Sequence, residues 1–154
     1  MESRLDYRSA VPEAIQALRA LQQYVDRCGL DSKLLELVKL RASQLNGCAY
    51  CVDMHTKDAR GLGETEQRLY AVSVWREAPF FSERERAALA WTESVTLLSR
   101  TGVPDDVYQT ARRQFSEQEL VNLTLAIIAI NSWNRLAVSF RAVAGSYRPA
   151  AASA

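Results

Sequence analysis

Apolar residues recur along this chain mainly at intervals of three and four positions, the spacing that places them on one face of an α-helix. Between residues 12 and 29, for example, Ile15, Leu18, Leu21 and Val25 follow this spacing. No stretch alternates between apolar and polar residues for long enough to predict a β-strand. The pattern therefore predicts an all-α fold, a helical bundle in which each helix buries one apolar face.

Capping and helix-breaking residues divide this pattern into about seven helices. A Ser-x-x-Glu capping box precedes the fifth and the seventh of them, and an Asn-Gly pair that tolerates positive φ ends the second. The predicted helices run from Ser9 to Gly29, from Asp31 to Asn46, from Cys48 to Arg60, from Thr65 to Pro79, from Glu83 to Arg100, for a short stretch after Pro104, and from Ser116 to about Val143. We interpret residues 1–154 as one domain, with a core over about 5–145 and a frayed tail over 146–154.

Composition and charge exclude several classes of function. The 154 residues include 19 Lys and Arg against 18 Asp and Glu, and this balance predicts no nucleic-acid partner and no anionic membrane partner. The N-terminus lacks a secretory signal, and the longest apolar run, Leu123 to Ile130, is too short to cross a bilayer. A cytoplasmic protein is therefore expected. Because thiols are kept reduced there, its three cysteines indicate catalysis or metal binding before a structural disulfide.

Candidate chemistry gathers in one stretch, where Cys48, Cys51 and His55 follow the Asn-Gly pair. Intervals of three and four place these side chains on one face of the predicted helix. Both thiols lie in its first turn, where unpaired backbone N–H groups favour a thiolate, and the imidazole one turn later can accept the thiol proton. A second thiol can also convert a sulfenic acid into a disulfide before it oxidises further. The spacing thus indicates a redox-active dithiol.

The energetics explain why such thiols need a base beside them. A thiol with a pKa of about 8.5 is only a few per cent thiolate at neutral pH, and lowering that pKa by about two units takes roughly 2.7 kcal/mol. A helix N-terminus supplies about 0.3–1 kcal/mol, so His55 must supply much of the rest. Glu36, among Leu and Val residues before the dithiol, is the candidate partner of that imidazole, because a carboxylate with apolar neighbours needs a partner. The alternative is a solvated Glu36 that pairs with Lys33 or Lys39.

The pattern Glu-x11-Cys-x2-Cys-x3-His resembles the signature of the AhpD-like alkyl hydroperoxidases, in the carboxymuconolactone decarboxylase superfamily. Residues 40–48, 54–60, 75–79 and 130–135 resemble its small single-domain branch, and the resemblance covers about residues 5–145. It implies an all-helical homo-oligomer that reduces organic hydroperoxides with its paired cysteines. It also implies that Cys51 becomes the sulfenic acid, that Cys48 resolves it, and that His55 and Glu36 form the proton relay.

One position departs from the family pattern. The best-studied members carry a histidine between the cysteines, whereas this chain carries Tyr50, which can donate a hydrogen bond but cannot act as a base near neutral pH. The decarboxylases of the superfamily lack the cysteine pair, so decarboxylation is not expected. No flavin, haem or nucleotide motif is visible, and we expect no cofactor and no metal. The resemblance implies a thiol reductant, with lipoamide or a thioredoxin-like protein as candidates.

Two other classes of function remain open. Cys48, Cys51 and His55 could bind zinc, with Glu36 or Cys28 as a fourth ligand, although the chain lacks the second ligand pair that structural zinc sites use. The dithiol could also belong to a thiol–disulfide oxidoreductase, or to a redox sensor without peroxidase turnover.

The remaining notable residues have plainer interpretations. Cys28 has no partner at motif spacing and is interpreted as a packing residue. Lys57, Asp58 and Arg60 are interpreted as a solvated charged face. The three tryptophans are assigned to the core or to an interface, and Arg135 to a buried or intersubunit ion pair. The apolar face of the last helix, Leu123 through Ile130 with Trp133, is expected to pack against another copy of the chain in a homo-oligomer.

Overall fold

A computed structural model of the protein describes residues 2–149. The elements are α1 (Tyr7–Ala10), α2 (Pro12–Asp26), α3 (Ser32–Leu45), α4 (Ala49–Gly61), α5 (Glu66–Ala71), the 3₁₀ helix η1 (Val72–Val74), α6 (Glu83–Thr96), α7 (Leu98–Thr101), α8 (Asp105–Gln114) and α9 (Glu117–Phe140). No strand occurs within the described residues, and the predicted all-α class is confirmed.

The described part of the chain has nine α-helices instead of about seven, because predicted helices are interrupted. The first predicted helix breaks at Val11, whose φ of −141° and ψ of 66° are not helical. The following residue is Pro12, and a proline disfavours helical geometry in the residue before it. A second break at Leu97 separates α6 from α7, and α5 ends at Ala71, where one 3₁₀ turn continues the chain.

Local capping explains where the main helices begin. The Asp31 carboxylate accepts a hydrogen bond from the backbone N–H of Leu34 at the start of α3. Both predicted capping boxes are present, at Ser82 before α6 and at Ser116 before α9. These caps satisfy N–H groups that a helix cannot pair internally. The few residues around each cap therefore determine where the helix begins.

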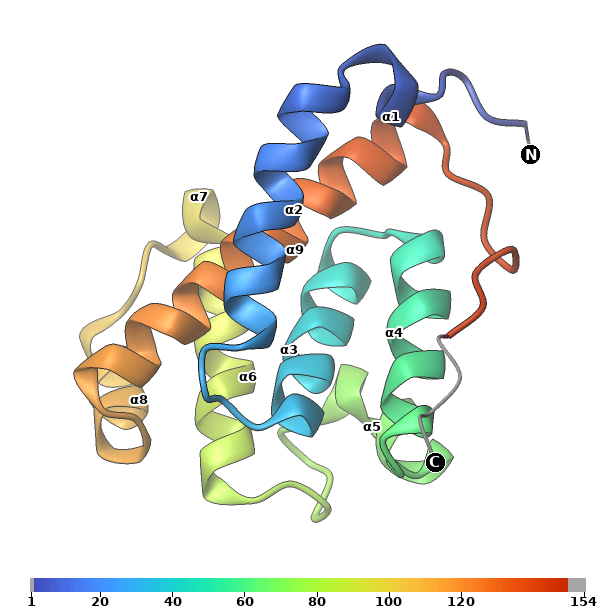
Figure 1. The fold of residues 1–154 in the computed structure, drawn as a ribbon. Helices are drawn as coiled ribbons and strands as arrows, with labels where there is room; N and C mark the ends of the chain where they lie inside the picture. The colour runs from blue at the N-terminus through green and yellow to red at the C-terminus, as the bar shows by residue number, and fades with distance from the viewer. Residues whose placement is uncertain (1, 150–154) are drawn as a thin grey trace.

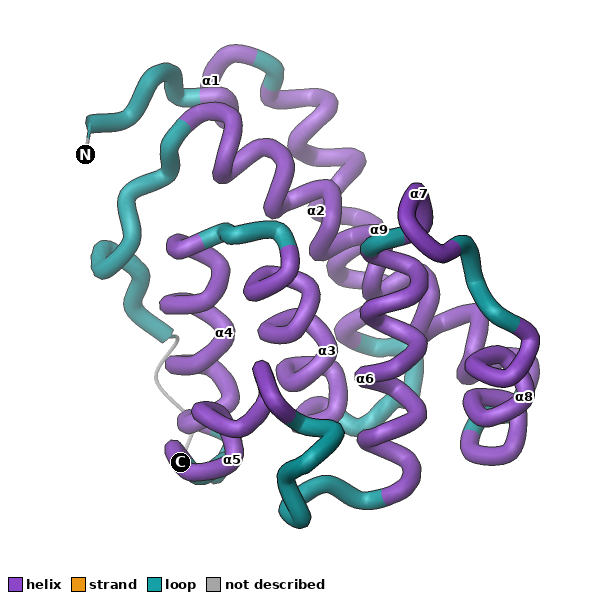
Figure 2. The backbone as a smooth tube through the Cα atoms, turned by 180° about the vertical axis from the view of Figure 1, so that it is seen from behind, coloured by secondary structure: helices purple, strands orange, loops and turns teal. Residues whose placement is uncertain are grey.

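The longest helix, α9, crosses the molecule, and α3 packs against it as well as against α4 and α6 (Figure 1). Seen from behind, α4, α3 and α6 stand side by side (Figure 2). Almost every residue of α3 from Leu34 to Ser43 is buried, Arg41 being the exception, because this helix has neighbours on most of its sides. Its polar members, including Glu36 and Lys39, are therefore enclosed by the fold.

Among the described helices, α9 alone is long and apolar enough to cross a membrane by length and composition. Its apolar residues Leu123, Ile127 and Ile130 lie instead in the interior of the chain. Its asparagines make hydrogen bonds to other helices, as that of Asn134 to Ser43 on α3 illustrates. These contacts are those of a central core helix.

After α9 the chain returns alongside α4 (Figures 1 and 2). The backbone N–H of Gly145 donates to Asp53, the Lys57 ammonium donates to the carbonyl oxygen of Tyr147, and the Tyr147 hydroxyl donates to Asp58. Residues 146–149 are thus held by more contacts than the expected frayed tail implies. The rest of that tail, residues 150–154, lies outside the described residues.

Candidate active site

The two cysteines of the motif lie at the turn between α3 and α4. Gly47 has a φ of +65°, in the region that favours glycine, and the reversal there makes Cys48 the N-cap residue of α4. Cys48 and Cys51 are paired as a disulfide with Cα atoms 5.4 Å apart, and the Cys48 sulfur accepts a hydrogen bond from the Cys51 backbone N–H. Both side chains are buried. The dithiol therefore occupies the N-terminal turn of a helix, as its spacing predicts.

Glu36 and His55 meet across the α3–α4 pair. The Nδ1 atom of His55 lies 2.8 Å from Oε2 of Glu36, and both residues are at least 90% buried. The short connection between the helices makes them antiparallel, so residues nineteen positions apart face each other. The structure thus brings together all four residues of the predicted site.

Lys39 is a member of this site that the sequence analysis considered only as a solvated partner of Glu36. Its ammonium lies 2.9 Å from Oε1 of Glu36 and 3.3 Å from Oδ1 of Asp26, and it is only 6% exposed. Lys39 and His55 therefore bind the two oxygens of one carboxylate. The alternative of a solvated Glu36 is therefore wrong, although Lys39 does pair with it, in the interior.

This arrangement keeps Glu36 ionised. Burial alone would raise the pKa of Glu36, but the hydrogen bond from His55 and the charge of Lys39 outweigh it and hold the pKa below its ordinary value. Burial likewise opposes the charged form of Lys39, and Glu36 and Asp26 outweigh it and raise the pKa of that ammonium. The two buried charges stabilise each other.

The ionised carboxylate determines the tautomer of His55. A carboxylate only accepts hydrogen bonds, so Nδ1 of His55 must carry a proton and donate it to Glu36. In the neutral imidazole the other nitrogen, Nε2, is then an acceptor. It is buried and has no hydrogen-bond partner within the described residues. His55 is therefore held in one orientation, with Nε2 left as an acceptor.

A cavity of about 640 Å³ opens onto this group. Cys51, His55, Glu36 and Lys39 contribute to its lining, whereas Cys48 does not. The two sulfurs thus differ in position, because a molecule in the cavity meets Cys51 first. A volume of this size lies within the range of about 300–1,000 Å³ that is typical of small-molecule sites.

Several residues of the cavity wall were missed by the sequence analysis. Asp58, expected on a solvated face, lies beside the site and accepts a hydrogen bond from the Tyr147 hydroxyl at 2.8 Å. Burial raises the pKa of Asp58 in spite of that bond. Trp133, assigned to the core or to an interface, also lines the cavity. Asp58, Trp133 and Tyr147 come from three separate segments, so no spacing in the sequence connects them with the site.

The residues considered as zinc ligands do not present free thiols in this structure. The two motif cysteines are bonded to each other, and Cys28 packs against a different part of the core, as its interpretation as a packing residue requires. Glu36, His55 and Asp58 have donor atoms within 4.8 Å of one another. Lys39 and Tyr147 already hold the carboxylates of this group, and an ammonium there disfavours a second cation.

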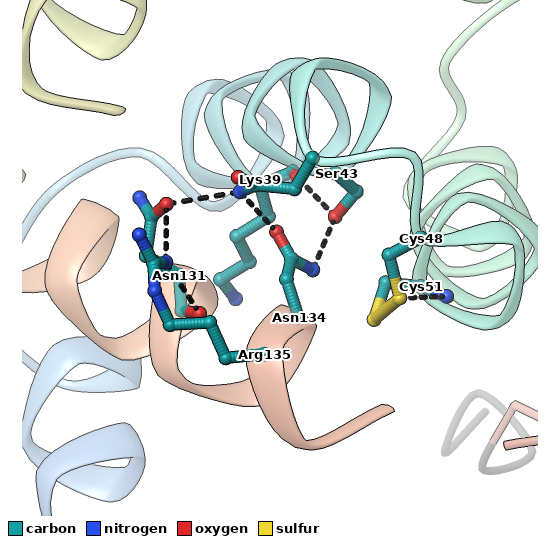
Figure 3. Close-up of a disulfide and its surroundings, with 8 residues drawn as sticks. Lys39, Ser43, Cys48, Cys51, Asn131, Asn134 and Arg135 are labelled. Atoms are coloured by element: carbon teal, nitrogen blue, oxygen red, sulfur yellow. Dashed lines mark hydrogen bonds between the residues drawn. A yellow bond between two sulfur atoms is a disulfide. The ribbon is translucent and has the colours of Figure 1, made fainter. Parts of the chain in front are cut away.

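A partly buried polar network supports the turn that carries Cys48 (Figure 3). The amide nitrogen of Asn46 donates to the side-chain oxygens of Asn131 and Asn134, at 2.9 Å each, and Asn134 donates to the Ser43 hydroxyl. Arg135 donates to the carbonyl and side-chain oxygens of Asn131. This arginine is exposed and forms no ion pair within residues 2–149, so the expectation of a buried ion pair within the chain is wrong.

Comparison with known proteins gives the family of this chain. The family model of the carboxymuconolactone decarboxylase family matches residues 10–94. YdfG of Bacillus subtilis (strain 168), an uncharacterised protein, is 42% identical over 139 residues, which are 90% of this chain and 95% of YdfG.

Solved structures show the same fold. The crystal structure of ATU0492 from Agrobacterium tumefaciens, a protein of unknown function, has a TM-score of 0.89 and 49% identity, over 97% of this chain and 99% of that one. The debrominase Bmp8 has a TM-score of 0.81 at 19% identity, over 90% of this chain and 74% of its own. With a family model that matches more than half of its length and a relative that aligns nearly end to end, the chain belongs to the carboxymuconolactone decarboxylase family.

Proposed function

We propose that the protein is a thiol-dependent peroxidase that reduces organic hydroperoxides. The observation that carries this proposal is the geometry around Cys51. This thiol lines a small-molecule cavity, has Cys48 at disulfide distance, and shares the cavity with a histidine base oriented by Glu36. Family membership alone would not decide the chemistry, since Bmp8, which has the same fold, is a debrominase.

In the first step the Cys51 thiol gives its proton to Nε2 of His55, and the thiolate attacks the terminal oxygen of the hydroperoxide. The O–O bond breaks as the S–O bond forms, and the departing alkoxide takes the proton back from His55 to leave as an alcohol. Cys51 is oxidised to a sulfenic acid and the peroxide is reduced. Glu36 stabilises the imidazolium that exists between the two proton transfers.

In the second step the Cys48 thiol attacks the Cys51 sulfur. The S–S bond forms, the S–O bond breaks, and the hydroxyl leaves as water with the proton from Cys48. Turnover then requires a dithiol reductant, which supplies two electrons and two protons; lipoamide or a thioredoxin-like protein suits this role. ATU0492 has been provisionally named as the antioxidant defence protein AhpD, which agrees with this cycle. We place the reaction in the cytoplasm and in a homo-oligomer.

Peroxide consumption by the reduced protein tests this proposal. With cumene or tert-butyl hydroperoxide, we expect cysteine-dependent loss of peroxide and a Cys48–Cys51 disulfide detected by mass spectrometry. Cys51→Ser should abolish the reaction, and Cys48→Ser should leave a sulfenic acid on Cys51 that a dimedone probe labels. Because general acid–base catalysis contributes about 10²–10⁴-fold, His55→Gln should slow the reaction by at least about 10²-fold. Glu36→Gln should slow it less.

Cys28→Ser is the matched control, since Cys28 is the free cysteine outside the site, and this variant should keep the full rate. Consumption no faster than that of a free thiol at the same pH would exclude a peroxidase. Reversible oxidation of the dithiol without peroxide turnover would then identify a thiol–disulfide oxidoreductase or a sensor. Dimedone label on Cys48 in Cys51→Ser, with none on Cys51 in the converse variant, would reverse the assigned roles.

A further inference from the structure

The charged side chains that line the cavity beside Cys51 differ in whether they have a partner within the described residues. All three carboxylates in its lining already accept hydrogen bonds from side chains: Glu36 from Lys39, Asp26 from Lys39 and Gln22, and Asp58 from Tyr147. The one lysine of the lining is bound to two of them. Each of these carboxylates is therefore already engaged by a neighbouring donor.

Two arginines of the lining, in contrast, have no ion-pair partner within the described residues. Arg8 of α1 and Arg19 of α2 are both exposed, and neither forms an ion pair with any residue between 2 and 149. Arg8 lies beside the Tyr50 hydroxyl, which raises the pKa of the guanidinium. Arg8, Tyr50 and Cys51 all line the same cavity, so a guanidinium without an ion-pair partner within the described residues shares this space with the Cys51 sulfur.

The rest of the wall is mainly apolar. The apolar and aromatic side chains of the wall come from three helices or their ends, α1, α4 and α9: Tyr7, Met54, Leu62, Trp133 and Ala137. A volume of about 640 Å³ far exceeds what hydrogen peroxide or a short alkyl hydroperoxide fills. Such a wall fits a long or bulky hydrocarbon body.

We infer that the preferred substrates are amphipathic hydroperoxides that carry a carboxylate, such as long-chain fatty-acid hydroperoxides. Arg8 and Arg19 bind the carboxylate, and the apolar wall holds the hydrocarbon so that the hydroperoxide reaches Cys51. An arginine is suited to this task because its planar guanidinium can bind a carboxylate through two parallel hydrogen bonds. The inference rests on the proposed peroxidase function and uses the same reaction steps.

A comparison of charged and neutral substrates tests the inference by kinetics. We expect kcat/KM for a hydroperoxide of octadecadienoic acid to exceed that for its methyl ester at least tenfold, with the difference shrinking as salt is added. The double variant Arg8→Gln/Arg19→Gln should reduce this preference to within about twofold. Arg27→Gln, which removes an exposed arginine at the end of α2 outside the cavity, should retain it.

A binding measurement separates the inference from catalysis. In the Cys51→Ser protein, calorimetry should show that 10-hydroxyoctadecanoic acid, a stable analogue of the alcohol product, binds at least tenfold more tightly than its methyl ester. The double arginine variant should lose this difference, and circular dichroism should show that it keeps its helices. Equal dissociation constants for acid and ester in Cys51→Ser would overturn the inference.

The two proposals fail in different ways. If the wild type reduces tert-butyl hydroperoxide but treats acid and ester alike, the carboxylate preference is wrong and the peroxidase function stands. If no hydroperoxide is reduced, the peroxidase function is wrong, and tighter binding of the acid would then show an anionic ligand site without that reaction.

Discussion

At the scale of single residues, the carboxylates around the cavity differ in what surrounds them. Glu36 accepts hydrogen bonds from the Lys39 ammonium and from His55, and these partners hold it ionised. Asp58 has one neutral donor, the Tyr147 hydroxyl, and burial raises its pKa. Burial and the negative charge of Asp58 also raise the pKa of Tyr147, so that hydroxyl stays protonated and keeps donating. Burial favours the protonated form of both carboxylates; it prevails at Asp58 and is outweighed at Glu36, where a cation accompanies the carboxylate.

This difference predicts how stability responds to pH at Asp58. A raised pKa means that the folded protein binds a proton at Asp58 more tightly than the unfolded chain does. The free energy of unfolding therefore falls as the pH rises from the ordinary Asp pKa, about 3.9, through the higher pKa of the folded protein. Asp58→Asn removes the charge and keeps an acceptor for Tyr147. The variant should be more stable than the wild type at pH 7, with the difference gone near pH 3, in urea unfolding.

Asp53 provides a control of opposite sign on the same helix. The hydrogen bond from Lys57 lowers the pKa of Asp53, so its contribution to stability is present above the ordinary Asp pKa and is lost as pH falls through the folded one. Asp53→Asn should therefore be less stable than the wild type at pH 7. Destabilisation of equal size by both substitutions at pH 7 would contradict the assigned environment of Asp58.

At the scale of elements, the position of the dithiol depends on contacts between α9 and the α3–α4 turn. Asn134, fully buried on α9, accepts from Asn46 in that turn and donates to Ser43 on α3 (Figure 3). Three different segments are thus joined by one amide. Since buried polar groups are costly when unpaired, this junction favours one registry of α9 against the turn.

Removing that amide should destabilise the fold measurably. Asn134→Ala leaves Ser43 and Asn46 each without one partner, and an unsatisfied buried group costs about 1–3 kcal/mol. We expect a lower midpoint of urea unfolding by circular dichroism, with a loss in that range. Ser132→Ala, an alanine substitution on the same helix, removes one hydroxyl that bonds only within α9 and should change stability by less than about 0.5 kcal/mol. Similar losses for the two variants would show that the junction contributes nothing specific.

At the scale of the whole molecule, α9 has two apolar faces. The residues expected at an interface, Leu123 to Ile130, include Leu123, Ile127 and Ile130, which are buried within the chain itself. The apolar side chains that α9 leaves exposed are Val121, Ile128 and Val138. Val121 and Ile128 are seven residues apart and lie on one face, so a contact between copies through α9 would use these residues.

The predicted homo-oligomer can therefore be tested through the exposed face. A charge on an apolar surface that is buried on association is costly, so Ile128→Glu should shift the protein to a slower species in sedimentation velocity. Val74→Glu, which places the same charge on an exposed apolar residue of the 3₁₀ helix, should sediment like the wild type. A wild-type monomer at micromolar concentration would refute the prediction.

The sequence by itself determined the helical class, most helix starts and the four residues Glu36, Cys48, Cys51 and His55. Apart from Glu36, which the family resemblance adds from the preceding helix, these features depend on residues within one or two turns of each other, where capping and helical spacing act directly. Only the tertiary structure decided that Lys39 and Asp26 complete the ion pairs of the site, that Tyr147 returns to Asp58, and that Arg8 and Arg19 line the cavity. Those contacts join segments up to 89 positions apart. They depend on how whole helices pack, which the spacing of apolar residues along one helix does not encode.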